Sequence, residues 1–276
     1  NFLKIETQTA IFQLSTTSLG VFSLEQALES NNNQRYYSSL ENSLALTDKK
    51  GNKYYPIINS ICDTSKEKTT NAPITLTLLI TGFFQTNKTE SINKNTATRF
   101  EAEITFYYHN SNTKWHFTLH NPQAMANNNG TWDLGNSNSQ FFQSFCGFIP
   151  CENQRKAAYQ IQDELAAKTT STAWHENNEQ LTIFQAGSGG DNWQSNNHVN
   201  HQGKMPIEFN GYEISANTLQ NKSRIKGRAT PVIYVEQRNQ QLAINISVYI
   251  ENFWQKFPKS IEVSANNIIL GLFPHY

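Results

Sequence analysis

The sequence predicts an all-β protein, a large antiparallel β-sandwich of the supersandwich type with one or two short helices. Three observations predict it: apolar and polar residues alternate with a period of two, β-branched and aromatic residues are frequent, and turn-forming residues separate these stretches. Aromatic residues make up 12% of the 276 residues, which supplies the burial that a folded core needs. We expect residues 1–276 to form a single β-sandwich domain, excised from a longer multidomain protein.

The alternating stretches give the expected strands. The clearest is a hairpin of residues 99–108 and 115–120, in which Phe100, Ala102 and Ile104 share one face. A turn is expected at residues 48–52, where Asp, Lys and Gly precede a strand. The other expected strands are residues 2–14, 53–58, 74–84, 180–185, 231–237, 242–249, 260–263 and 267–273.

Two segments have helical rather than strand periodicity. Residues 154–168 place their apolar side chains on one face at a helical spacing. Residues 250–257 space an isoleucine and three aromatic residues in the same way, and Pro258 ends the segment; such a group predicts core packing. Residues 24–29 follow a capping-box-like Ser23 and are either a short helix or the end of a strand.

The charge balance excludes some classes of partner. The chain has 22 basic and 22 acidic residues, so no basic field is present to attract a nucleic acid. No apolar run reaches the length of a membrane span, so no membrane partner is expected. Only 16% of residues are charged, and an Asn-, Gln-, Ser- and Thr-rich surface suits neutral hydrogen-bonding ligands such as sugars. An Asn-rich source organism explains the same composition.

The cysteines and histidines predict no metal site and no cofactor. Cys62, Cys146 and Cys151 are too few for a disulfide scaffold; Cys146 and Cys151 either close a small loop or remain free thiols. No second close Cys/His pair completes a zinc pattern. His198 and His201 have a spacing that can share a metal, but no third ligand is marked.

One polar segment, residues 188–203, is long for a loop in a compact domain, and loops of this length are usually functional or disordered. Trp193 offers an apolar face for a sugar ring, and Asn and His side chains both donate and accept hydrogen bonds, as vicinal hydroxyls require. The alternative is a loop that caps the sheet and satisfies its own backbone. A second polar segment, residues 129–135, contains Trp132 and Asp133.

At these segments the chain resembles the central β-sandwich domain of the exo-rhamnogalacturonan lyase-like proteins. Members of that family join an N-terminal RIFT barrel, this sandwich and a C-terminal α/α-toroid. The resemblance covers most of the chain in islands, and the Ser-Gly-Gly-Asp-Asn-Trp and Asn-His-Val-Asn runs are its most specific part. The islands are residues 3–7, 132–135, 188–193, 197–200, 209–212, 227–229 and 253–259.

The resemblance implies a parent enzyme that eliminates across a glycosidic bond next to a uronate in a pectin- or rhamnogalacturonan-type glycan. Such chemistry needs a base, an acid and a group that neutralises the carboxylate. The implied catalytic residues are His198, Tyr212, Lys204 and Arg228. The implied substrate-binding residues are Asn192, Trp193, Asn197, Asn200, His201, Trp132 and Asp133.

The toroid would supply part of such an active site, so we expect the isolated chain to be inactive. The alternative is a non-catalytic module that binds carbohydrate or only supports its neighbours. The expected partners are therefore carbohydrate and the neighbouring domains of the parent chain. Glycan chemistry favours a secreted or periplasmic location.

Overall fold

The computed structural model of the chain shows strands and turns, and the all-β prediction is confirmed. It describes residues 2–19, 23–26, 34–36, 44–65, 74–86, 97–123, 138, 140–151, 155–171, 175–176, 180–191, 209–216, 223–239 and 242–274. No helix occurs among these residues, and hence none that could cross a membrane.

The chain divides into two compact units, each described by itself. Unit 1 is Asn1–Thr131 with Gly135–Phe142, and unit 2 is Trp132–Leu134 with Gln143–Tyr276. The expectation that residues 1–276 form one domain stays a prediction.

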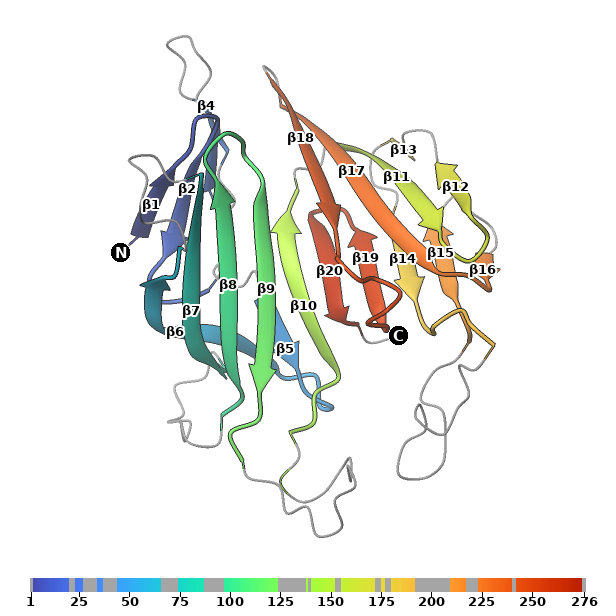
Figure 1. Cartoon of the computed structure of the whole chain (residues 1–276), viewed down its shortest axis with the longest axis horizontal. Coiled ribbons are helices and arrows are strands. Elements are labelled where there is room, and N and C mark those ends of the chain that lie inside the picture. Colours follow the sequence, from blue (N-terminus) through green and yellow to red (C-terminus); the bar gives the residue numbers. More distant parts are fainter. Residues whose placement is uncertain are drawn as a thin grey trace. The chain divides into compact units, whose positions relative to one another are not determined.

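Unit 1 contains two antiparallel layers (Figure 1). The first is a sheet in chain order of β1 (Phe2–Glu6), β2 (Ile11–Ser15), β3 (Ser23–Gln26) and β4 (Gln34–Tyr36). The second is a run in chain order of β5 (Leu44–Thr47), β6 (Lys53–Asp63), β7 (Thr75–Gln85), β8 (Arg99–Tyr107) and β9 (Thr113–His120). The predicted hairpin is confirmed as β8 and β9, and the turn at residues 48–52 is also present.

The two layers of unit 1 pack as a sandwich. Phe12 on β2 meets Phe106 on β8 edge to face, with ring centroids 5.1 Å apart, and both side chains are buried. Along β8 every second side chain is buried, so its alternation sends Phe100, Ala102 and Ile104 inward. The opposite face of β8 is exposed and presents the polar side chains of Arg99, Glu101 and Glu103.

Unit 2 is a second antiparallel sandwich. One layer runs in the order β16 (Ser223–Ile225), β15 (Tyr212–Ala216), β14 (Leu181–Gln185), β19 (Lys259–Val263), β20 (Asn267–Phe273), β10 (Ser144–Pro150). The other runs in the order β12 (Lys168–Ser171), β11 (Arg155–Asp163), β17 (Ala229–Asn239), β18 (Leu242–Tyr249), and β13 (His175–Glu176) also pairs with β11.

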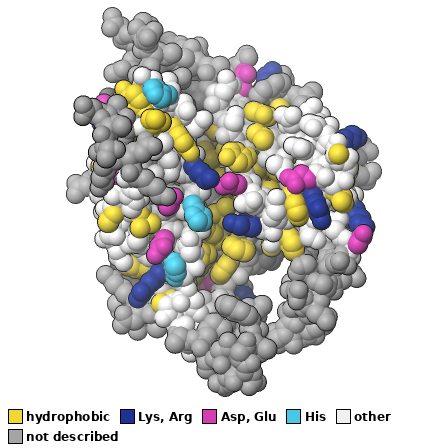
Figure 2. Space-filling model, in the orientation of Figure 1, with side chains coloured by type: hydrophobic (Ala, Val, Ile, Leu, Met, Phe, Trp, Pro, Cys, Tyr) yellow, Lys and Arg dark blue, Asp and Glu magenta, His cyan; other side chains and the backbone are white. Residues whose placement is uncertain are grey.

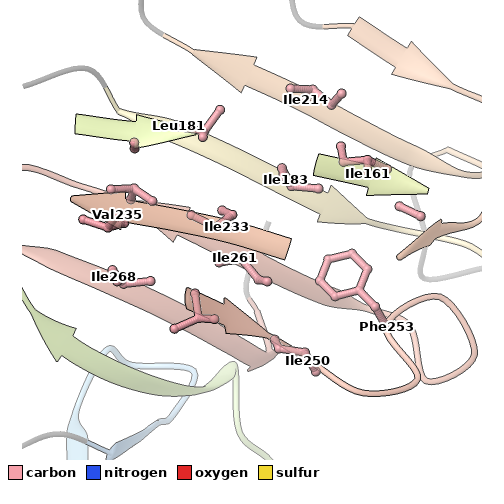
Figure 3. Packing of buried hydrophobic residues seen from close by; sticks show 14 of the residues in the cluster. Ile161, Leu181, Ile183, Ile214, Ile233, Val235, Ile250, Phe253, Ile261 and Ile268 are labelled. Atoms are coloured by element: carbon pink, nitrogen blue, oxygen red, sulfur yellow. The ribbon is translucent and has the colours of Figure 1, made fainter. Parts of the chain in front are cut away.

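The core of unit 2 lies between these two layers (Figure 3). Ile161, Ile233 and Val235 from one layer face Ile183 and Ile261 from the other, and all five are fully buried. Their β-branched side chains suit a pleated surface that packs against a second sheet.

The helix predicted at residues 154–168 is wrong. The segment forms β11, a turn at residues 164–167 and the start of β12. Nine consecutive residues of β11 pair with β17, which places Ala157 and Ile161 in the core. The Ala- and Gln-rich composition favours a helix only weakly, and sheet pairing overrides it. Leu165, predicted on the apolar face, is 46% exposed in the turn.

The other helix-like segments are also not helices. Residues 251–256 are consecutive turns, with a single helix-type bond from Lys256 N to Asn252 O and a positive φ of 57° at Asn252. The predicted core packing of this segment is confirmed for Ile250 and Phe253. Of the two alternatives for residues 24–29, the strand holds at its described part, since β3 ends at Gln26.

The strand expected at residues 2–14 is interrupted. It is a hairpin of β1 and β2, in which the hydroxyl of Thr7 accepts a hydrogen bond from the backbone N–H of Ala10 in the turn. All three cysteines are free thiols. Because Cys146 lies within β10 and Cys151 directly follows it, five extended residues hold them about 16 Å apart, too far for a disulfide.

Candidate functional site

The structure places two of the predicted site residues, Tyr212 and Arg228, in unit 2. The others lie outside the described residues, so their predicted roles remain predictions: His198, Lys204, Asn192, Trp193, Asn197, Asn200, His201, Trp132 and Asp133.

Four islands of the family resemblance meet around Tyr212 and Arg228. We call their described residues the motif cluster: Ser188–Asp191, Phe209–Tyr212, Gly227–Ala229 and Trp254. Arg228 joins three of its parts. The Nε atom of Arg228 donates to the carbonyl of Ser188 at 3.2 Å, and its guanidinium lies over the Trp254 ring, 4.4 Å from the centroid. Segments up to 66 positions apart in the sequence thus share one location in the fold.

Asn210 joins the described residues on the two sides of positions 192–208. Its Oδ1 atom accepts a hydrogen bond from Gly189 N at 2.8 Å, and its Nδ2 atom donates to Gly190 O at 2.8 Å. These bonds hold Gly189, Gly190 and Asn210 together, and Asp191 and Phe209 are the described residues that flank positions 192–208. An ion pair at the exposed rim, Lys226 Nζ to Asp191 Oδ1 at 2.6 Å, adds a further link.

Gln185, at the end of β14, connects backbone segments of the motif cluster through its side chain. Its side chain is fully buried and forms three hydrogen bonds with backbone groups. The Nε2 atom donates to Gly187 O at 2.7 Å and to Gly227 O at 3.0 Å, and the Oε1 atom accepts from Ala229 N at 3.0 Å. A buried amide is tolerated at this position because its donor and acceptor are both satisfied.

Asp163, at the end of β11, supports the cluster from the other layer of the sandwich. Its carboxylate is buried and accepts hydrogen bonds from the backbone N–H of Arg228, Leu165 and Ala166 at 3.0–3.2 Å. It also accepts one from the Tyr212 hydroxyl at 3.3 Å. The carboxylate thus fixes both the turn after β11 and the start of β17.

Tyr212 is directed into the core. Its side chain is 3% exposed, and burial together with the nearby charge of Asp163 raises the pKa of its hydroxyl to about 12. A hydroxyl that is buried, protonated at neutral pH and engaged with Asp163 acts in the structure as a hydrogen-bond donor that holds the sandwich together.

The sequence reasoning missed Asp163, Gln185 and Asn210. Glycines carry the signal that could have found them. An added Cβ at Gly189 would lie 2.3 Å from the carbonyl oxygen of Gly227, and one at Gly227 would lie 2.2 Å from Asp163 Oδ2. Glycines in separate motifs indicate places where backbones approach closely, and such places need buried polar partners.

Lys259 on β19 is the register partner of Gln185 on β14, and its buried ammonium group has a shifted pKa that can be tested. Its side chain is buried, its Nζ atom donates to Leu272 O, and burial, with the charge of Lys256, lowers its pKa to about 8. Between pH 8 and 10.5 the unfolded chain then binds a proton that the folded chain does not, so folding stability rises with pH in that window.

We expect the free energy of unfolding of the native chain to rise, relative to that of Lys259→Met, as the pH increases from 8 to 10. The measurement is urea unfolding of both proteins at half-unit pH steps. The upper limit avoids the titration of Tyr212, whose raised pKa has the opposite sign of effect above pH 10. A constant difference between the two proteins would show that Lys259 keeps its ordinary pKa in the fold.

Comparison with protein-family models finds no match to the chain, and comparison with curated proteins finds none either. Within the described ranges, no group of three or more His, Cys, Asp or Glu side chains is placed to hold a metal ion.

Proposed function

We propose that the chain is a carbohydrate-binding β-sandwich module whose binding loop is the segment between Asp191 and Phe209. One observation carries this proposal: the amide of Asn210 bonds to Gly189 and Gly190, so the residues that flank the segment on its two sides are held together. Binding residues are concentrated on loops that a rigid scaffold positions, and this segment is long and rich in Asn and His, with one Trp.

The motif cluster is better suited to structural support than to catalysis. Tyr212 and Arg228, the two implied catalytic residues that the structure describes, are used in contacts that hold the fold. A catalytic acid needs a proton that it can release near working pH, and a pKa of about 12 does not provide one. We therefore favour binding over lyase activity for this chain.

The ligand class in this proposal follows from the loop's side chains. Trp193 supplies a face for a sugar ring, and Asn192, Asn197, Asn200 and His198 supply hydrogen-bonding groups of both kinds. Lys204 lies in the same segment and would add a cation for a uronate carboxylate. An acidic oligosaccharide of the rhamnogalacturonan type is the ligand that uses all of these groups.

Titration calorimetry of the whole chain with rhamnogalacturonan oligosaccharides tests the proposal. We expect Trp193→Ala and the double variant Asn197→Ala/Asn200→Ala each to weaken binding about tenfold or more, since each removes a stacking face or a set of hydrogen bonds. Asn266→Ala is the matched control, because Asn266 is an exposed asparagine in another turn of unit 2. If the loop variants and the control variant change binding equally, the proposal that this segment binds the oligosaccharide is overturned.

The same samples separate binding from elimination. A lyase forms an unsaturated product whose ultraviolet absorbance rises with time, and we expect no rise from this chain alone. A rise that His198→Ala abolishes while the protein stays folded would replace the binding proposal with the lyase interpretation.

A further inference from the structure

A polar hollow of about 490 Å³ lies on the outer face of unit 1, over β6, β7, β8 and the end of β9. We propose that this hollow is a second binding site, for a polyhydroxylated ligand of one or two sugar residues. Nothing in this proposal depends on the loop between Asp191 and Phe209. Among the residues that line it are Asn59, Gly82, Arg99, Glu101, His120 and Asn121.

The hollow arises from an irregularity in β6. The pairing of β6 with β7 shifts between Ile58 and Ser60, which leaves Asn59 as the extra residue of a bulge. Opposite the bulge, Gly82 has no room for a side chain, because a Cβ there would lie 2.0 Å from the carbonyl oxygen of Ile57. Bulges redirect side chains and often lie next to binding sites.

One wall of the hollow is fixed in place. Asn121 uses both ends of its amide on the backbone, donating from Nδ2 to Asn138 O at 2.9 Å and accepting from Gln123 N at 3.0 Å. Pro122 follows it and adds an apolar, conformationally restricted surface. A preformed wall lowers the entropy that a ligand must lose on binding.

Three charged or titratable side chains converge on the hollow. Arg99 and Glu101 lie two residues apart on the outward face of β8, and His120 is the register partner of Arg99 on β9. The distance from His120 Nε2 to Glu101 Oε1 is 3.6 Å, and both side chains remain about half exposed. Figure 2 shows histidine, acidic and basic side chains gathered over β8 and β9 on this face.

These groups complement a sugar rather than an ion. Each hydroxyl of a sugar both donates and accepts; Glu101 accepts, Arg99 donates, and His120 does either. In the described part of the chain no acidic side chain forms an ion pair with Arg99, so its donors are available. A carboxylate beside Arg99 disfavours a phosphate or another multiply charged anion. The volume falls in the range of small-molecule sites, about 300–1,000 Å³.

Calorimetric titration of the whole chain with galactotetraose and with tetragalacturonate tests the inference. We expect Glu101→Gln and His120→Ala each to weaken binding of galactotetraose, the neutral probe, about tenfold or more, and tetragalacturonate to bind more weakly than galactotetraose to the native chain. Matched controls lie two and four residues away on the same faces: Glu103→Gln and His116→Ala remove the same groups outside the hollow and should change binding less than twofold.

The outcomes separate this site from the binding loop. Weakening by Glu101→Gln and His120→Ala, without weakening by Asn197→Ala/Asn200→Ala, supports the hollow even where the loop fails. Weakening by Asn197→Ala/Asn200→Ala, without weakening by Glu101→Gln and His120→Ala, overturns the proposed site in the hollow and supports the proposed binding loop. Equal effects of the site and control variants, or no binding of galactotetraose by the native chain, also overturn the proposal that the hollow binds a sugar. All four positions in unit 1 are exposed or half-exposed, so the variants should keep the native melting temperature.

Discussion

Replacing Asp163 with alanine is expected to destabilise unit 2 by about 3–4 kcal/mol. The side chain is only 5% exposed, and it accepts bonds from Arg228 N and the Tyr212 hydroxyl, both of which would be left buried without an acceptor. Each buried donor that loses its partner costs about 1–3 kcal/mol. Urea unfolding, monitored by hydrogen exchange of the backbone amides of β14 and β17, measures the loss of unfolding free energy in unit 2.

Asp48→Ala provides a matched control for that loss. The Asp48 carboxylate also accepts four hydrogen bonds, from Lys50 N, Asn52 N, Asn52 Nδ2 and the Tyr54 hydroxyl, but in an exposed turn of unit 1. Water can replace the lost acceptor there, so a much smaller effect is expected. If the two substitutions lower stability equally, burial is not what makes Asp163 important.

Strand prediction succeeded where alternation was strong. The predicted strand of residues 242–249 matches β18, and that of residues 267–273 matches β20, to the residue. The first segment has β-branched residues at every second position, Ile244, Ile246 and Val248, and the second has aliphatic residues at positions 268, 270 and 272. Where the alternation of side chains is this clear, the local sequence is sufficient to predict the strand.

The failures occurred where the periodicity was ambiguous. In residues 154–168, Ala158 and Ile161 fit a helical face, but Ala157 and Ile161 fit a strand equally well. The choice depends on β17, which is more than 60 positions away and contributes nine paired residues. A local pattern cannot report such a distant partner.

The candidate site was predictable only in part, for a related reason. Arg228 and Tyr212 were singled out, and both lie in the motif cluster. In the structure these two residues contact Ser188, Trp254 and Asp163, and the catalytic role implied for them by the resemblance stays a prediction. Residue type indicates what a side chain can do chemically, but its burial and partners decide whether that capacity is available.

Gly189→Ala is expected to destabilise unit 2 by about 3 kcal/mol and to weaken the glycan binding proposed for the segment between Asp191 and Phe209. Gly189 has a φ of 71°, and an added Cβ would lie 2.3 Å from the carbonyl oxygen of Gly227. That carbonyl accepts from Gln185 Nε2, so its displacement breaks a buried hydrogen bond. The backbone N–H of Gly189 also donates to Asn210, so the anchor of the loop would shift.

Gly51→Ala separates crowding from backbone conformation in this prediction. Gly51 has a φ of 79°, close to that of Gly189, but nothing lies within 4 Å of an added Cβ. Its substitution should cost only the strain of a left-handed residue, about 1 kcal/mol. Urea unfolding, with amide exchange of β6 for unit 1 and β14 for unit 2, measures both effects. Equal losses would show that conformation alone requires Gly189. A larger loss at Gly189, accompanied by weaker binding of rhamnogalacturonan oligosaccharides, would show that close packing of the motif cluster positions the loop.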